Sequence, residues 1–344
     1  MKPDENKRHE IRPHRSTRRQ FVLAFGAAAM ANTWPALAQP AGKVWRIAYL
    51  DYGSRQSMID AGRMAALMQG LRELRYVEGG NFTFEARYAE GKVERVDALA
   101  AELVAQMPDL ILTAGTPTSL AIKRATSTIP VVVITTADPV GDGLAATLAR
   151  PGGNVTGMST GAGETVQKLV ELLIVAVPKI KRVAVLTNPA NGRSADDLAQ
   201  VLGALRKTGR SALPLRASTA QEIEQAFAAM TRERAEGVVI GIDGFMLQQR
   251  VQIAALALKA RLPSIYPTPA YAEAGGLMSY GADLTDNFRR AAIFVDKIFK
   301  GARPGELPFE QPTRYVLALN RKTADALGVK ISNELLLRAD RVIE

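Results

Sequence analysis

The stretches RIAYL at residues 46–50 and RVAVL at residues 182–186 are two short apolar runs of similar pattern, 136 positions apart. The segments that follow them carry apolar residues at helical spacing, which predicts amphipathic helices. Further apolar runs come after each stretch in the same order, at 110–114 and 129–135 and then at 237–242 and 262–266. Alternating buried strands and helices predict parallel sheets that helices cover on both faces.

This repetition predicts an α/β protein with two Rossmann-like lobes joined by a hinge. The alternative is two unrelated doubly wound domains, which would lead to the same inference about function. We expect lobe 1 to comprise residues 44–157 plus about 280–308, and lobe 2 residues 158–279 plus about 309–344. The other expected elements are strands at 44–50, 81–88, 212–215 and 314–319, and helices at 59–74, 93–106, 118–125, 195–207, 220–234 and 286–300.

The composition restricts the chemistry that the chain can perform. Its 344 residues include no cysteine and carry a formal net charge of +10. Without cysteine, disulfides, thiolate metal sites and cysteine nucleophiles are excluded. The basic residues are scattered and mixed with acids, as in the RER stretch at 232–234, so they indicate solvated faces rather than a nucleic-acid surface.

The first 38 residues have the three parts of a secretory signal peptide. These are a basic region at 1–19, an uncharged region at 20–38 and a small-residue cleavage site that ends at Ala38. The stretch STRRQFV at 16–22 is similar to the twin-arginine (Tat) export pattern. A Sec signal with a chance arginine pair and an uncleaved anchor are the alternatives. We expect cleavage after Ala38 and a periplasmic protein without membrane insertion.

The predicted cleavage changes what the mature chain contains. The only two histidines, His9 and His14, would leave with the signal, and the net charge would fall to +6, from 37 basic and 31 acidic residues. A chain without histidine or cysteine cannot use Ser-His-Asp or Cys-His catalysis. The G-x-S-x-G pattern at 157–161 is therefore interpreted as a chance match. Catalysis by a pair of carboxylates stays open, although no spacing singles out a pair.

Ligands of open α/β sheets bind beyond the carboxyl ends of the strands, so residues that follow the strands are the candidate binding residues. Two sheets that face each other through these ends would enclose a ligand, and closure would be a hinge motion. The candidates are the polar and aromatic residues at these positions, namely Tyr52, Ser54, Thr116, Asp138, Asn188, Asp243 and Tyr266.

These residue types suit a small solute with charged groups. Thr116 followed by Pro117 predicts a helix N-cap and first turn, where free N–H groups can bind a carboxylate. Asp138 or Asp243 could pair with an ammonium, and Tyr52 could stack on a flat group. Helix capping, turn formation and core packing are the alternative roles for the same candidates.

Several stretches together resemble one protein family. They are GLRELRYVEG at 70–79, AGTP at 114–117, DPVG at 138–141, LARPGGNVTG at 148–157, AVLTNPAN at 184–191, EAGGLMSYG at 273–281 and LLLRAD at 335–340. The chain is similar over nearly its whole mature length to periplasmic substrate-binding proteins of ABC transporters. Within these, it resembles the large group of uncharacterised transport components with a type I periplasmic-binding-protein fold.

The resemblance implies two lobes, a hinged cleft, and delivery of ligand to a membrane permease with a cytoplasmic ATPase. It supports Ser54, Thr116, Asp138, Asn188 and Asp243 as cleft positions and places residues 279–281 near a hinge. Some relatives are associated with aromatic amino acids. This chain departs from the family's pattern at residues 51–55 and 242–245, which leaves the ligand open.

We therefore hypothesise an exported protein that captures a small polar or aromatic solute, with amino acids among the candidates. We expect it to be a monomer with no catalytic residue, metal, cofactor or nucleic-acid partner. A periplasmic sensor that presents its bound state to a membrane receptor is one alternative. A histidine-free enzyme that uses carboxylates is another.

Overall fold

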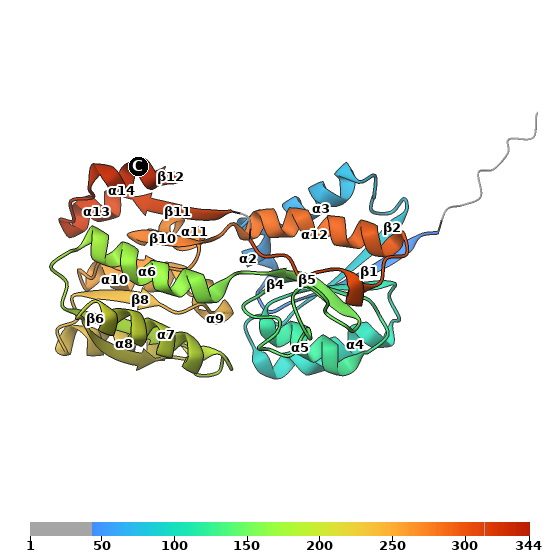
Figure 1. Ribbon diagram of the computed structural model, residues 1–344, viewed down its shortest axis with the longest axis horizontal. Coiled ribbons are helices and arrows are strands. Elements are labelled where there is room, and N and C mark those ends of the chain that lie inside the picture. The colour runs from blue at the N-terminus through green and yellow to red at the C-terminus, as the bar shows by residue number, and fades with distance from the viewer. Residues whose placement is uncertain (1–42, 313) are drawn as a thin grey trace, which may run out of the picture. The chain divides into compact units, whose positions relative to one another are not determined.

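The computed structural model describes residues 43–312 and 314–344, and the helices and strands of these described residues lie in the compact unit Val44–Glu344. The expected signal peptide, its arginine pair and its cleavage site lie outside the described residues. Within the described ranges, none of the helices is long and apolar enough to cross a membrane. The compact unit contains two sheets, each with helices on both faces (Figure 1).

Lobe 1 is built on a five-stranded parallel sheet with the strand order β2-β1-β3-β4-β5. Helices α3 and α12 cover one face, and α4 and α5 cover the other (Figure 1). The elements are β1 (Trp45–Asp51), α2 (Arg55–Asp60), α3 (Arg63–Glu73), β2 (Phe82–Tyr88), α4 (Val96–Ala105), β3 (Leu110–Ala114), α5 (Thr116–Ala125), β4 (Val131–Thr136), β5 (Val155–Ser159) and α12 (Leu284–Phe299).

Lobe 2 is built on a seven-stranded sheet with the order β12-β11-β10-β9-β8-β6-β7, in which only β10 and β11 pair antiparallel. The elements are α6 (Ala162–Ala176), β6 (Arg182–Thr187), α7 (Ser194–Lys207), β7 (Ser211–Arg216), α8 (Ala220–Arg232), β8 (Gly237–Ile240), α9 (Gly244–Gln248), α10 (Arg250–Lys259), β9 (Ser264–Tyr266), α11 (Pro269–Glu273), β10 (Met278–Ala282), β11 (Tyr315–Asn320), α13 (Arg321–Leu327), α14 (Asn333–Arg338) and β12 (Arg341–Ile343).

The two sheets have the same core topology. The order β2-β1-β3-β4-β5 in lobe 1 matches β7-β6-β8-β9-β10 in lobe 2, strand for strand. Long apolar runs such as β3 and β4 are almost wholly buried, because a parallel sheet is covered on both faces. The α/β class and the repeated architecture expected from the sequence are confirmed.

The structure adds a fifth strand to each repeat, which the apolar pattern did not predict. Both β5 and β10 are short and contain a glycine. A Cβ on Gly157 would lie 2.0 Å from the Val133 carbonyl oxygen, and one on Gly281 would lie 1.8 Å from the Pro267 carbonyl oxygen. Gly157 of β5 therefore packs against the backbone of β4, and Gly281 of β10 packs against the residue that follows β9.

The chain passes between the lobes next to these fifth strands. After β5 it enters α6, which packs on the second sheet, and after β10 it enters α12, which packs on α3 of lobe 1. The chain crosses between the lobes a third time after Glu310, which forms a β-bridge with Met158, and then enters β11. The exact domain boundaries drawn from the sequence stay a prediction.

One expected helix is divided into two. Gly62 has a φ of 64° and separates α2 from α3, where the sequence predicted one helix over 59–74. A left-handed glycine interrupts the helical hydrogen bonds, so α3 starts in a new direction with Arg63 as its first residue.

Candidate functional site

A cavity of ≈ 170 Å³ lies between the carboxyl ends of the two sheets. Its lining comes from both lobes. Lobe 1 contributes Tyr52 after β1 and Thr116 after β3, and lobe 2 contributes Asn188 after β6 and Asp243 after β8. The same cavity is lined by apolar and aromatic side chains, among them Met58, Leu247, Tyr271, Leu284 and Phe288. Four of the seven candidates from the sequence thus meet in one cavity.

Asp243 is the acceptor at the centre of the lobe 2 side of the cavity. Its oxygens accept hydrogen bonds from the side-chain amides of Asn188 and Asn191, both at 3.1 Å. It also caps α9 by accepting from the Met246 N–H at 2.9 Å. Burial raises the pKa of Asp243, while these donors act in the opposite direction. Asp243 therefore both caps α9 and lines the cavity.

Thr116 makes a different contact from the one expected. Gly115, with a φ of 101°, is the N-cap of α5, so the prediction that Thr116 caps this helix is wrong. A backbone at this φ suits glycine, and Thr116 becomes the first helical residue. Its hydroxyl lies 3.1 Å from that of Thr136 and donates to Asp142 at 3.3 Å. Thr136 donates to the same carboxylate at 3.2 Å.

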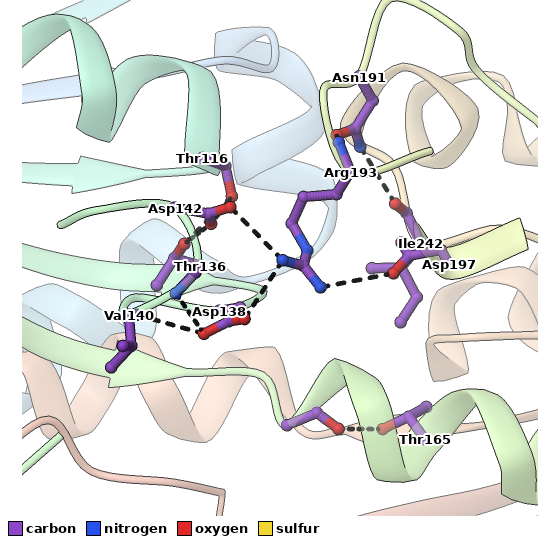
Figure 2. Close-up of polar contacts among 12 residues, drawn as sticks. Thr116, Thr136, Asp138, Val140, Asp142, Thr165, Asn191, Arg193, Asp197 and Ile242 are labelled. Atoms are coloured by element: carbon purple, nitrogen blue, oxygen red, sulfur yellow. Dashed lines mark hydrogen bonds and ion pairs between the residues drawn. The ribbon is translucent and has the colours of Figure 1, made fainter. Parts of the chain in front are cut away.

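Arg193 connects the two lobes beside the cavity (Figure 2). It precedes α7 of lobe 2, and its guanidinium lies 3.3 Å from Asp138 and 3.6 Å from Asp142, both in the loop after β4 of lobe 1. A third carboxylate, Asp197 on α7, lies 3.8 Å away. The Arg193 side chain is only 14% exposed, so these attractions are weakly screened by solvent.

The acids around Arg193 are held in a poorly solvated environment. Burial raises the pKa of Asp197 to about 6, against the lowering effect of Arg193, and burial also raises the pKa of Asp142. One oxygen of Asp197 is buried and has no hydrogen-bond donor among the described residues. This cluster holds more carboxylates than cations, which favours a ligand that brings a positive group.

Tyr52 packs across the lobe boundary. A Cβ on Gly244 would lie 2.8 Å from the Tyr52 ring, so the ring rests directly on the start of α9. The Tyr52 hydroxyl donates to the Gly91 carbonyl at 2.8 Å, and burial raises the pKa of Tyr52 to about 12, helped by the charge of Asp243. The ring is therefore a neutral, oriented wall of the cavity.

The other three predicted site residues do not line this cavity. Ser54 caps α2 by accepting from the Ser57 N–H at 3.1 Å. Asp138 accepts from the Gly141 N–H at 2.9 Å and holds its turn, while its second oxygen faces Arg193. Tyr266 is fully buried in lobe 2 and stacks on Tyr271 with ring centroids 4.6 Å apart. Capping, turn formation and core packing are the contacts observed for these three.

The sequence reasoning missed Arg193, Asp142 and Asp197, although a signal was present. Arg193 lies two residues after the Asn188–Asn191 turn, and Asp197 comes four residues later, which puts both on one face of a helix. Asp142 follows Asp138 by the same interval. Within the described residues, no group of three or more acidic or histidine side chains could hold a metal ion.

The sequence of this chain matches a known protein family. The sequence model of a family described as ABC transporter substrate binding protein matches residues 57–343. A tyrosine-binding protein of Clostridioides difficile (strain R20291) is 23% identical over 263 residues, which cover 76% of this chain and 75% of that protein.

Two solved structures are similar in fold and sequence. A conserved domain protein from Vibrio cholerae has a TM-score of 0.82 and 28% identity, covering 87% of this chain and 100% of its own. An ABC domain from Streptococcus pneumonia in complex with L-Trp has a TM-score of 0.81 and 25% identity, covering 88% of this chain and 100% of its own. The likeness extends over both lobes.

Proposed function

We propose, because this chain belongs to the family of ABC transporter substrate binding proteins, that it captures an amino acid with a large side chain in the interlobe cavity. Proteins of this family bind small solutes and work with ABC transporter components. The observation that carries the proposal is one cavity lined by Tyr52 and Thr116 from lobe 1 and by Asn188 and Asp243 from lobe 2. A solute held by both lobes stabilises the closed protein.

The lining supplies a partner for each part of an amino acid. Thr116 and Pro117, in the first turn of α5, line the cavity. First-turn N–H groups lack acceptors within their helix, so the N–H of Thr116 suits a carboxylate, whereas Pro117 has no N–H. The excess of acids around Asp197 and Asp243 suits an ammonium group. Tyr52, Phe288 and Met58 supply apolar surface for the side chain.

The names of two relatives support aromatic amino acids as the first solutes to test. One is called a tyrosine-binding protein, and the other was solved in complex with L-Trp. A thermal-shift screen of the amino acids, with native mass spectrometry of protein taken from its own cell envelope, tests the proposal. If no amino acid raises the melting temperature and none co-purifies, the amino-acid assignment is abandoned.

We propose that the protein binds its solute without converting it. The support is the match to a family of binding proteins over residues 57–343. After prolonged incubation, the bound solute should be recovered with its mass unchanged. A product of different mass would favour the carboxylate-based enzyme instead.

We further propose that residues 1–38 direct export by the Tat route and are removed after Ala38. The support is the STRRQFV stretch at 16–22 and the small residues that end at Ala38. The N-terminal residue of the exported protein should be Gln39, and export should stop when Arg18 and Arg19 are both changed to lysine. Export that survives this change would identify a Sec signal.

The proposed partners are a membrane permease and its ATPase, to which a monomer presents the closed, loaded form. Family membership supports the ABC transporter partner. Reconstituted permease and ATPase should hydrolyse ATP faster when the loaded protein is added, and a monomer mass is expected on size exclusion.

Gly244→Val is expected to weaken solute binding about fivefold without unfolding the protein. The backbone of Gly244 contacts the Tyr52 ring across the lobe boundary, so a branched side chain there would hold the lobes apart. A fivefold change corresponds to about 1 kcal/mol, a modest steric cost. Isothermal titration calorimetry measures the affinity. Gly192→Val, where an added Cβ would meet nothing within 4 Å, is the matched control and should bind normally.

Asp197→Asn is expected to stabilise the protein more at about pH 8 than at about pH 5, by roughly 1 kcal/mol. The pKa of Asp197 is raised to about 6 from 3.8, so its contribution to stability is complete below the lower value and is lost as the pH rises through the higher one. Asparagine does not ionise, so the variant does not lose this stability as the pH rises. Urea unfolding at both pH values measures the difference. Asp325→Asn, at an exposed position of α13, is the control and should show no such difference between the two pH values.

A further inference from the structure

We propose that Arg63 and Gln248 bind an acidic group on the solute's side chain, so that the cavity selects an amino acid whose side chain ends in a carboxylate or a similar acid. Arg63 is the first residue of α3 in lobe 1, and Gln248 ends α9 in lobe 2. Both line the cavity. The inference rests on the proposed function, because it specifies the solute that this cavity takes.

Arg63 is a cavity-lining cation whose guanidinium lacks a protein acceptor. It makes no hydrogen bond or ion pair with the part of the chain that the structure describes. The nearby acid, Asp51, already accepts from the Tyr49 hydroxyl and from the Gly53 N–H. Arg63 is partly exposed, and a guanidinium with five N–H donors and no protein acceptor can give charge-assisted hydrogen bonds to an anion in the cavity.

Gln248 is a second donor without an acceptor at the same cavity. Its side-chain nitrogen is buried and has no hydrogen-bond partner among the described residues. The side chain reaches lobe 1, since a Cβ on Gly53 would lie 3.9 Å from that nitrogen and one on Gly91 would lie 2.5 Å from its oxygen. An acid between Arg63 and Gln248 would contact both lobes and so favour closure.

The charges that face Arg63 leave this end of the cavity positive. Burial lowers the pKa of Arg63, and the neighbouring charge of Arg250 lowers it further, while Asp51, Tyr49 and Glu273 act in the opposite direction. Glu273 is engaged by Arg341 at 2.9 Å. Among the described residues, the Leu247 carbonyl is the one acceptor of the Arg250 side chain, at 3.4 Å. Two arginines therefore face a single buried carboxylate, Asp51.

This end differs in its charged neighbours from the acidic end described above. The charges that act on Asp197 are Arg193, Asp196, Asp142 and Asp243, and none of them is among those that act on Arg63. The cavity thus has an acceptor-rich end around Asp243 and a donor-rich end around Arg63, with apolar side chains such as Met58 and Phe288 also in its lining. A zwitterionic head with an acidic side chain matches this distribution of charge.

Matched pairs of amino acids test the selection directly. The pairs are L-2-aminoadipate against L-norleucine, and 4-carboxy-L-phenylalanine against 4-methyl-L-phenylalanine, each titrated calorimetrically at about pH 7.5. In at least one pair, the acid should bind wild-type protein about tenfold more tightly than its neutral partner, as expected for a charge-assisted hydrogen bond. Arg63→Met should abolish that preference while leaving the neutral partner within about twofold.

Gln248→Leu is a second variant that leaves α3 unchanged, and it should reduce the preference for the acid by about threefold. Arg55→Met, an exposed residue of α2, is the control and should preserve the preference. Equal binding of both members of each pair to wild type would overturn the inference. So would an Arg63→Met variant that weakens both members alike.

The outcomes separate this inference from the function on which it rests. If tyrosine or tryptophan binds and neither acid does, the acidic selection is wrong and the proposed function stands. If no amino acid of any kind binds, both are wrong.

Discussion

Arg193→Met is expected to weaken solute binding by about 100-fold, close to 3 kcal/mol, which is in the range measured for removing one member of a buried charge pair. Arg193 lies within 4 Å of Asp138, Asp142 and Asp197, and two of these belong to the opposite lobe. Without the guanidinium, closure would bring three carboxylates together with no cation between them. The open protein would not suffer this repulsion, because its carboxylates can be solvated separately.

Calorimetric titration of the strongest-binding amino acid measures this effect, and small-angle scattering at saturating solute measures closure. The Arg193→Met protein should scatter as a more open molecule than the wild type. Arg232→Met removes an arginine that is 72% exposed and should bind as the wild type does. Normal affinity in Arg193→Met would show that the ion pairs across the lobes contribute little to closure.

Gly157→Ala is expected to lower the free energy of unfolding by about 3 kcal/mol, in the range that overpacking produces at a buried site. Gly157 lies in the buried strand β5 with a φ of 146°, and an added Cβ would lie 2.0 Å from the Val133 carbonyl oxygen. A backbone oxygen within a sheet cannot move aside as a flexible side chain can. Strand β5 would have to separate from β4 where the chain leaves lobe 1.

Urea unfolding measures this loss, and Gly203→Ala provides the control. Gly203 lies within helix α7, and an added Cβ there would meet nothing within 4 Å. Alanine is the better helix former by about 1 kcal/mol, so this variant should match or exceed wild-type stability. A Gly157→Ala protein as stable as the Gly203→Ala protein would mean that β5 tolerates displacement.

The repeated α/β architecture could be predicted because its strongest elements are local patterns. Strands β3, β4, β6 and β8 are continuous apolar runs, which a sheet covered on both faces requires. Strands β5 and β10 have glycine and polar residues among few apolar ones, so their sequence does not distinguish them from loops. They are strands because each pairs with the preceding strand of a sheet that already exists.

The candidate site also has one part that the sequence predicts and one part that it does not. The sequence by itself determined that Tyr52 and Thr116 would lie at one edge of the first sheet, and Asn188 and Asp243 at the corresponding edge of the second. Each of them follows a strand, and the carboxyl ends of parallel strands share an edge. Only the tertiary structure decided that Arg193 and Arg63 belong there too. Both lie at helix starts, and some of the charges that face them come from the opposite lobe, at positions distant in sequence. These are Asp138 and Asp142 for Arg193, and Arg250 and Glu273 for Arg63. Local spacing carries no information about which charges two separately folded lobes bring together, since that depends on how their surfaces meet.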